Sequence, residues 1–236
     1  MTSKTIALVT GANQGIGKAI VKGLANQGII VYLGSRNAER GIAAANDLQH
    51  EGEVHFIQMD VTDPSSIEQS YDTIQKQYGR LDILINNAGV AASRNKPRDA
   101  DATEFRHVYE TNVFGVVSII NQMLPLLRKS AAGRIVNISS LRGSLGDEGA
   151  FVGQPSISYS SSKTALNALT VHYARELAKN NIKVNSAAPG HVATEFNNFS
   201  GTRTPEQGAA IAIHLATLDE QGPTGSFFDD TKRIPW

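Results

Sequence analysis

The chain has 236 residues, 22 basic and 22 acidic side chains with a formal net charge of zero, and no cysteine. This length suits a single α/β domain with a substantial core. The charges are interspersed and balanced, so neither nucleic acid nor an anionic membrane is expected as a partner. The lack of cysteine excludes disulfides, thiolate zinc sites and cysteine nucleophiles.

The N-terminus runs directly into a strand-like segment at residues 5–9, without the basic region, long apolar core and cleavage site of a signal peptide. The longest apolar stretch, residues 113–127, contains polar side chains and falls short of the roughly 20 residues of a membrane-spanning helix. We therefore expect a cytoplasmic protein.

Short apolar runs rich in β-branched residues predict buried strands at residues 6–9, 29–33, 54–57, 81–85, 135–138 and 184–188. Segments with helical spacing of apolar residues lie between them, at 16–26, 38–50, 64–78, 102–127 and 158–179, and a closing helix begins near Pro205. This alternation predicts one domain over residues 1–236, with a Rossmann-type doubly wound parallel sheet and helices on both faces. Ligands of such sheets bind at the carboxyl ends of the strands.

A glycine-rich loop, Thr10-Gly11-Ala-Asn-Gln-Gly15-Ile-Gly17, joins the first predicted strand to the first helix. Glycines permit a tight turn and close approach of the backbone to a pyrophosphate, and a helix N-terminus attracts anions. An ordinary glycine-rich turn is the alternative. We expect this loop to contact a dinucleotide through Gly11, Asn13, Gln14, Gly15, Ile16 and Gly17.

The end of the second strand predicts which dinucleotide binds. An NAD site places a carboxylate there to accept from the ribose, whereas this chain has Ser35 and Arg36 and no acidic residue in 33–37. Both side chains suit a 2′-phosphate, so NADP(H) is preferred over NAD(H). The alternative is that Arg36 is a solvated loop residue. After the third strand, Asp60 and Val61 are expected beside the adenine.

Tyr159-Ser-Ser-Ser-Lys163 places a phenol and an ammonium at positions i and i+4 of a predicted helix, on one face. A nearby positive charge lowers a tyrosine pKa from about 10 by roughly 1–3 units. We therefore expect Tyr159 to exchange a proton near neutrality. The alternative is an exposed tyrosine near a helix start.

Four motifs occur in order: the glycine loop, Asn86-Asn87-Ala88-Gly89, Asn137-Ile-Ser-Ser140 and Tyr159 with Lys163. Together with the segment from Pro189 to Thr194, they resemble the short-chain dehydrogenase/reductase family over nearly the whole chain. Within it, the GSRN after the second strand and the C-terminal tail look most similar to NADPH-dependent carbonyl reductases. Some of these carry a long insertion between the serine and tyrosine motifs, whereas 18 residues separate Ser140 from Tyr159 here.

The resemblance implies roles for these residues. Tyr159 would exchange the proton with the substrate, and Lys163 would lower its pKa and hold the nicotinamide ribose. Ser140 would donate to the substrate oxygen, with Ser139 as its rival. Asn112 would kink its helix and anchor a water for proton relay, or else be an asparagine satisfied inside a helix. The remaining cofactor contacts implied are Asn87, Ala88, Gly89, Pro189, Gly190, Val192 and Thr194.

The expected activity is NADPH-dependent, reversible hydride transfer between nicotinamide and a ketone, aldehyde or secondary alcohol. The alternatives are a catalytically silent NADP(H)-binding sensor or scaffold, and an isomerase or dehydratase of sugar nucleotides, for which the chain after Gly190 is short. The six histidines form no metal-binding pattern, and no GxSxG motif indicates a hydrolase.

Two segments are expected to contact the substrate: a first substrate loop (141–158) and a second substrate loop (195–204). Their aromatic residues Phe151, Phe196 and Phe199 suggest an apolar pocket. The helices at 102–127 and 158–179 resemble those of a shared four-helix interface, which predicts a homo-oligomer, either dimer or tetramer.

Overall fold

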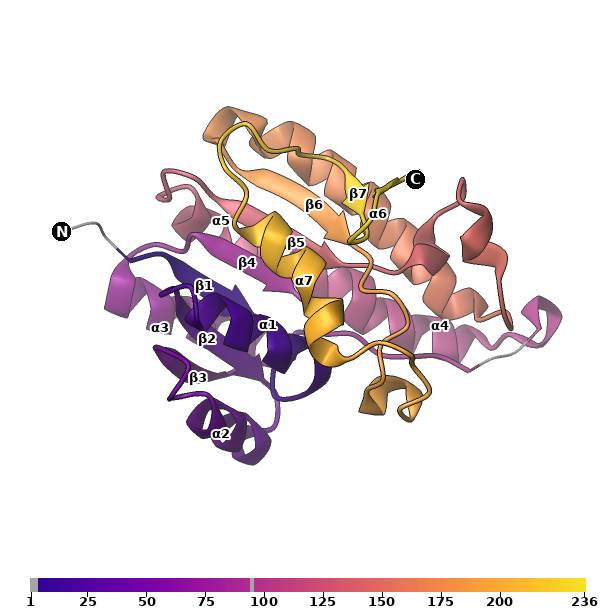
Figure 1. Cartoon of the computed structure of the whole chain (residues 1–236), viewed down its shortest axis with the longest axis horizontal. Coiled ribbons are helices and arrows are strands. Elements are labelled where there is room, and N and C mark those ends of the chain that lie inside the picture. The colour runs from indigo at the N-terminus through magenta and orange to yellow at the C-terminus, as the bar shows by residue number, and fades with distance from the viewer. Residues whose placement is uncertain (1–3, 94–95) are drawn as a thin grey trace.

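The computed structural model describes residues 4–93 and 96–236. The first three residues of the N-terminal stretch considered for a signal peptide lie outside this range. The described strands form one eight-stranded sheet in the order β3-β2-β1-β4-β5-β6-β7-β8 (Figure 1). They are β1 (Ile6–Val9), β2 (Ile30–Ser35), β3 (Val54–Gln58), β4 (Ile83–Asn86), β5 (Arg134–Ile138), β6 (Lys183–Ala187), β7 (Phe227–Phe228) and β8 (Arg233–Ile234).

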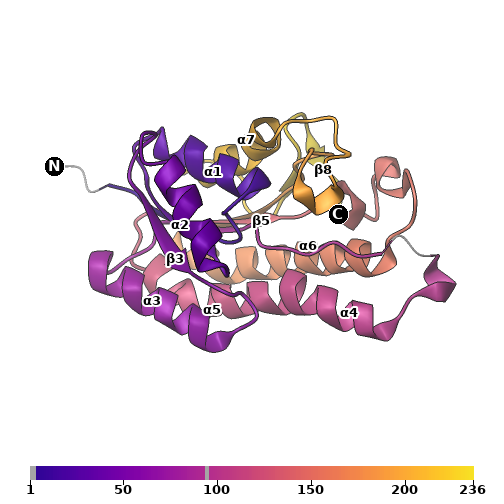
Figure 2. The ribbon, with the colours of Figure 1, turned by 90° about the horizontal axis from the view of Figure 1, so that it is seen from below.

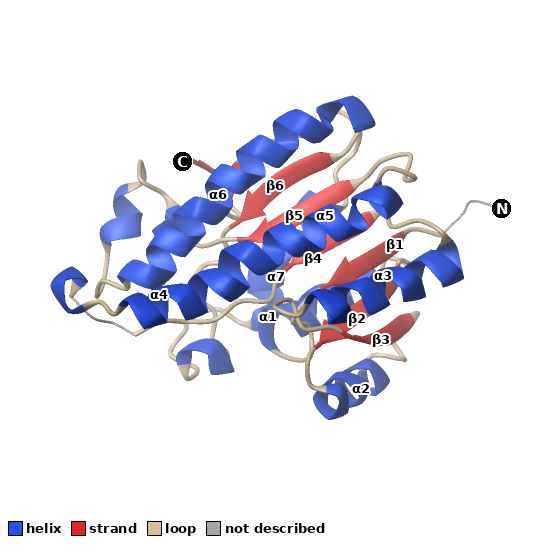
Figure 3. Ribbon diagram, turned by 180° about the vertical axis from the view of Figure 1, so that it is seen from behind, coloured by secondary structure: helices blue, strands red, loops and turns tan. Residues whose placement is uncertain are grey.

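Helices cover both faces of the sheet. They are α1 (Gly15–Ala25), α2 (Ala38–Asp47), α3 (Pro64–Tyr78), α4 (Ala102–Tyr109), α5 (Gly115–Leu127), α6 (Ile157–Leu177) and α7 (Pro205–Ala216). Short 3₁₀ segments occupy Pro97–Asp99, Leu141–Gly143, Glu148–Phe151, Ala178–Asn180 and Glu195–Asn197. In Figure 2 the layer of α1, α2 and α7 lies on one side of the sheet, opposite the layer of α3, α4, α5 and α6. Figure 3 shows the latter layer in front.

Each helix layer encloses a hydrophobic core against one face of the sheet, and the strands contribute side chains to both cores. On β1, Ala7 and Val9 pack into the core under α1 and α7, whereas Ile6 and Leu8 pack into the core under α3 and α5. Alternation of side chains across a strand explains this division. A strand buried on both faces is apolar at every position, which is the pattern that the sequence shows.

Local signals fix the helix ends. At the start of α3, the Asp63 carboxylate accepts from the Ser65 amide at 3.0 Å, and Pro64 occupies the first turn. The helix stops at Gly79, which has φ 70°. The predicted boundaries agree with the structure within a few residues.

Two features differ from the predicted elements. The single helix expected over residues 102–127 is α4 and α5 joined by a π-helix, Glu110–Phe114, which contains Asn112. A π-bulge of this kind is one of the recognised causes of a helix kink. The sheet is parallel from β3 through β7, but β8 pairs antiparallel with β7. This C-terminal hairpin was not predicted, since strands of two residues carry no alternating pattern.

Candidate active site

The glycine loop follows β1 and makes contacts that only glycine allows. Gly11 and Gly15 have φ of 60° and 55°, a region that other residues rarely adopt. A Cβ on Gly17 would lie 2.5 Å from Asn87 Nδ2, and one on Gly11 would lie 2.8 Å from the Ala88 Cα. The loop is therefore packed directly against the segment after β4.

The N-terminus of α1 suits an anion. Its N-cap, Gln14, makes no side-chain capping hydrogen bond, and the first backbone bond into the helix runs from Lys18 N to Gln14 O at 3.2 Å. The amides of Gly15, Ile16 and Gly17 therefore have no partner within the helix. Free amides and the positive end of the helix dipole match a pyrophosphate.

Thr10, which was given no role from the sequence, links the glycine loop to the segment that follows β4. Its hydroxyl oxygen accepts from the amides of Asn87 and Ala88 at 3.0 and 2.9 Å. The Asn87 side chain returns donors to the carbonyls of Thr10 and Gly11, both at 2.9 Å. The Asn87 side chain thus stabilises the conformation of the glycine loop.

The ends of β2 and β3 carry the residues predicted beside the adenosine. Ser35 is buried, and its hydroxyl donates to Asn13 Oδ1 at 3.2 Å and to Asn37 O at 3.0 Å. Arg36 is exposed. Asp60 Oδ1 accepts from the Thr62 amide and hydroxyl at 2.9 and 2.8 Å. Ser35 therefore braces the loop, and Arg36 is the group open to a phosphate.

Tyr159 and Lys163 lie on α6, with the Lys163 ammonium 5.6 Å from the centroid of the Tyr159 ring. Lys163 is buried and donates to the Ile138 carbonyl at 2.8 Å, and burial lowers its pKa to about 8. Burial also raises the pKa of Tyr159, opposed by a hydrogen bond with Ser140 and by the charge of Arg142. The expectation of a Tyr159 pKa lowered toward neutrality was therefore wrong, because desolvation of the phenolate outweighs the effects of Ser140 and of the Arg142 charge.

The two serines after β5 point to different partners. Ser139 is buried and donates to Asn167 Oδ1 on α6 at 2.7 Å. Ser140 is partly exposed, and its hydroxyl oxygen accepts from the Arg142 amide at 3.3 Å. It also lies close enough to Tyr159 to lower the pKa of that phenol. Of the two, Ser140 is the hydroxyl that a substrate bound at Tyr159 can reach.

The Asn112 side chain is fully buried and forms a bridge between two segments. Its Oδ1 accepts from Val90 N at 2.9 Å, and its Nδ2 donates to Val90 O and to Ser162 Oγ, both at 3.1 Å. The bridge ties the chain after β4 to α6, next to Lys163. These bonds occupy the Asn112 side chain. Through them, Asn112 holds the segment after β4 in position against α6.

The segment after β6 closes the site against the glycine loop. Gly190 has φ 78°, and a Cβ on Gly15 would lie 3.1 Å from the Thr194 methyl group. Val192 and Thr194 are buried. Phe196, which the sequence reading assigned only to the substrate loop, lies with its ring centroid 5.8 Å from that of Tyr159.

A family model described as short chain dehydrogenase matches residues 5–204. The chain belongs to this family. Among curated relatives it is 34% identical to "Carbonyl reductase [NADPH] 1" of Mus musculus, covering 100% of this chain and 99% of the relative, and 34% identical to "Salutaridine reductase" of Papaver bracteatum, covering 97% and 95%. The mouse alignment runs over 283 positions, so that relative carries residues with no counterpart here.

Solved structures of the family have the same fold. Salutaridine reductase from Papaver somniferum superposes with a TM-score of 0.85 at 31% identity, covering 96% of this chain and 100% of that chain. The structure titled "Pseudomonas aeruginosa RhlG/NADP active-site complex" gives 0.86 at 31% identity, covering 97% and 95%. In the described part of the chain, no helix is long and apolar enough to span a membrane.

In this short-chain dehydrogenase, most of the residues predicted from the sequence converge on one edge of the sheet. The glycine loop after β1 contacts residues 87–88 after β4 and Thr194 after β6. Lys163 bonds the last residue of β5, and Ser140 lies close enough to Tyr159 to lower its pKa. A Cβ on Gly89 would lie 3.8 Å from Lys163 Nζ. The arrangement places the free amides at the start of α1 on one side and the Tyr159 phenol, beside the Lys163 ammonium, on the other. These groups suit an oxidoreductase, the class of enzyme to which dehydrogenases belong.

Proposed function

We propose that the protein is an NADPH-dependent reductase that transfers hydride reversibly between nicotinamide and a ketone, aldehyde or secondary alcohol. The observation that carries this proposal is the grouping of Ser140, Tyr159 and Lys163 at the sheet edge that also presents the uncapped N-terminus of α1. Bound NADPH supplies the hydride. The protein binds and orients the cofactor and the substrate, and it exchanges the proton with the substrate.

The cofactor is proposed to lie along the strand ends. The amides at the start of α1 hold the pyrophosphate, and Arg36 pairs with the 2′-phosphate. Asp60 accepts from the adenine amino group, and Thr194 bonds the nicotinamide carboxamide. The names of the mouse carbonyl reductase and of the P. aeruginosa complex with NADP support the phosphorylated cofactor.

Proton transfer is assigned to Tyr159. Its raised pKa keeps the phenol protonated near neutral pH, which is the form needed to donate a proton to the oxygen of a carbonyl during reduction. Ser140 donates to the same oxygen and stabilises the charge that develops there. Lys163, held by the Ile138 carbonyl, keeps a cation beside the phenol and bonds the nicotinamide ribose.

The substrate is proposed to be apolar. Phe196 lies against Tyr159, so a carbonyl that reaches the phenol passes this ring. Large apolar side chains on both substrate loops are exposed, including Phe151 at 73% and Phe199 at 65%. Aromatic and aliphatic ketones fit such walls better than sugars or acids. We also propose that the protein is a homo-oligomer and that it acts in the cytoplasm.

The sensor or scaffold alternative is less favoured, since the chain keeps the serine, tyrosine and lysine, with Lys163 5.6 Å from the centroid of the Tyr159 ring and Ser140 near the phenol. The test is oxidation of NADPH and, separately, NADH, followed by absorbance with a panel of aromatic, aliphatic and hydroxylated carbonyl compounds. We expect turnover with NADPH on apolar carbonyls and a much lower kcat/KM with NADH. Tight NADPH binding without turnover of any carbonyl would favour the sensor.

A further inference from the structure

The turn of the C-terminal hairpin (residues 229–232) lies between the two substrate loops, and one side chain organises it. Asp229 Oδ1 accepts from the Thr231 amide at 2.8 Å, the Thr231 hydroxyl at 2.7 Å and the Lys232 amide at 2.7 Å. The Asp229 amide donates to the Lys232 carbonyl at 3.1 Å. These bonds fix the turn as one unit.

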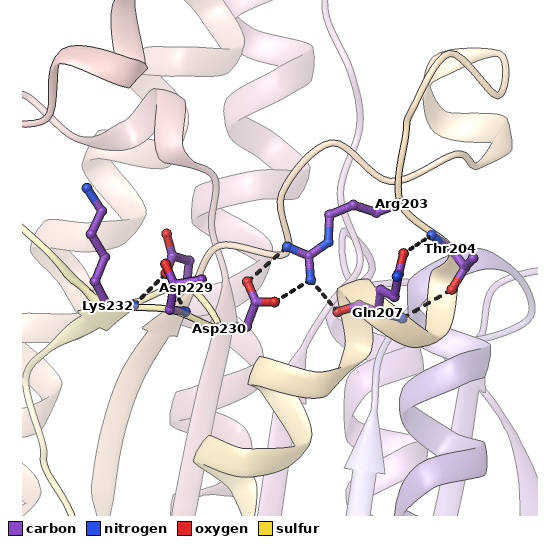
Figure 4. A network of polar contacts seen from close by, with 7 residues as sticks. Arg203, Thr204, Gln207, Asp229, Asp230 and Lys232 are labelled. Carbon is purple, nitrogen blue, oxygen red and sulfur yellow. Dashed lines mark hydrogen bonds and ion pairs between the residues drawn. The ribbon is translucent and has the colours of Figure 1, made fainter.

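From this hairpin turn, Asp230 reaches the second substrate loop. Its two carboxylate oxygens accept from both terminal nitrogens of Arg203, at 2.9 and 2.6 Å (Figure 4). Arg203 also donates to the Gln207 carbonyl on α7 at 2.9 Å. A two-point pair of this kind fixes orientation as well as distance.

Arg203 continues this connection to the segment proposed to lie beside the nicotinamide. Its amide donates to the His191 carbonyl at 3.1 Å, and its carbonyl accepts from the Ala193 amide at 2.9 Å. Its Cδ lies 2.8 Å from where a Cβ on Gly190 would stand. Arg203 therefore connects the Asp230 carboxylate to residues 190–193.

Lys232 extends from the same turn to the first substrate loop. Its ammonium lies 2.6 Å from Asp147 Oδ2, and Figure 4 shows its side chain directed away from the pair of Arg203 and Asp230. Asp147 also accepts from the Gly149 amide at 2.9 Å, and Ser144 donates to the Pro235 carbonyl at 2.6 Å. The hairpin therefore contacts the first substrate loop a few residues after Ser140.

We propose that the hairpin turn couples the two substrate loops, so that the ion pairs at Asp230 and Lys232 together set the spacing of the substrate pocket and the affinity for substrate. The kinetic part of this inference rests on the proposed function. Arg203, Asp147, Asp230 and Lys232 are positioning residues, which act through the loops and do not touch the reacting atoms.

The side chains of these pairs are partly exposed, at 27% and 34% for Arg203 and Asp230, and at 56% and 12% for Lys232 and Asp147. Partly exposed pairs contribute little to global stability. Their loss is therefore expected to raise local opening of the loops while the folded domain persists. Coupling between two sites is reciprocal, so perturbing either pair must loosen both loops.

Amide hydrogen exchange of the whole protein, alone and with NADPH, tests the coupling. Asp230→Asn should raise exchange at residues 190–203 and also at 144–149, and Lys232→Met should raise it in the same two segments. Glu176→Gln, which removes the exposed pair with Arg128 at the C-terminal ends of α5 and α6, is the matched control and should change neither. Asp229→Ala, which removes the acceptor at the centre of the turn, should loosen both loops.

Kinetics with an apolar ketone give the second readout. Asp230→Asn and Lys232→Met should raise KM by up to about fivefold, the range available to partly exposed pairs, with kcat within about twofold, and Asp230→Glu should restore KM. Exchange that rises only beside the altered pair would overturn the proposal. If wild type turns over no carbonyl, the proposed function fails, and the exchange result still decides the coupling.

Discussion

The ammonium of Lys163 lies 5.6 Å from the centroid of the Tyr159 ring, one helical turn away on α6. Burial moves the pKa values of the two groups in opposite directions: it lowers that of Lys163 to about 8 and raises that of Tyr159. Near neutral pH the phenol is therefore protonated while most of the lysine is charged. A protonated phenol is the form that can donate a proton to a carbonyl oxygen, as proposed for Tyr159.

The affinity for NADPH is expected to fall as pH rises through about 8, where Lys163 loses its proton in the free protein. The sign follows because the ammonium, and not the neutral amine, is proposed to favour the bound cofactor. Fluorescence titration from pH 6.5 to 9.5 measures this. Lys163→Met should bind more weakly and lack this pH dependence, and an affinity of wild type that stays constant over the range would contradict the proposed role.

Arg36→Leu should weaken NADPH binding by about 10- to 100-fold, the value of one or two charge-assisted hydrogen bonds. The affinity for NADH, which has no 2′-phosphate, should stay within about twofold of wild type, and Arg36→Lys should retain part of the preference. Calorimetric titration with both cofactors provides the comparison. Equal losses for NADPH and NADH would show that Arg36 does not recognise the phosphate.

The neighbouring serines form a matched pair of variants. Ser140→Ala should lower kcat by about 10²- to 10³-fold, as expected for loss of a donor to a developing oxyanion, with little change in melting temperature. Ser139→Ala removes the bond to Asn167 and should cost about 1 kcal/mol of stability, with most of the activity retained. The opposite pattern would make Ser139 the catalytic serine.

Thr10→Val should lower the free energy of unfolding by about 1–3 kcal/mol, because it removes the acceptor of the Asn87 and Ala88 amides. Thr10→Ser keeps the hydroxyl and is the control. Chemical denaturation monitors stability, and NADPH affinity should fall together with it, since the glycine loop loses its anchor. Unchanged stability in Thr10→Val would contradict this assignment.

Much of the fold follows from the sequence because parallel strands buried on both faces are continuously apolar. The glycine loop and the strand-end position of Ser140 follow from the same pattern, since parallel strands end at one edge of the sheet. Asn112 lies in a π-helix, and the kink expected there stays a prediction. The functional roles of these residues stay predictions until the variants are measured.

Other features depend on contacts between distant parts of the chain. The Tyr159 pKa depends on burial by tertiary packing, which the spacing of tyrosine and lysine does not contain. Thr10 accepts from amides 77 and 78 residues away, and Arg203 pairs with Asp230 across 27 residues. A polar residue in a loop gives no local sign of such partners.

The most direct test of the central claim is Tyr159→Phe, with NADPH oxidation measured on a carbonyl that wild type reduces and NADPH affinity measured in parallel. Removing only the phenolic oxygen should lower kcat by about 10²- to 10⁴-fold, the usual contribution of a positioned proton donor. The affinity for NADPH should stay near that of wild type. Turnover by Tyr159→Phe within about tenfold of wild type would contradict the account, because another group would then supply the proton.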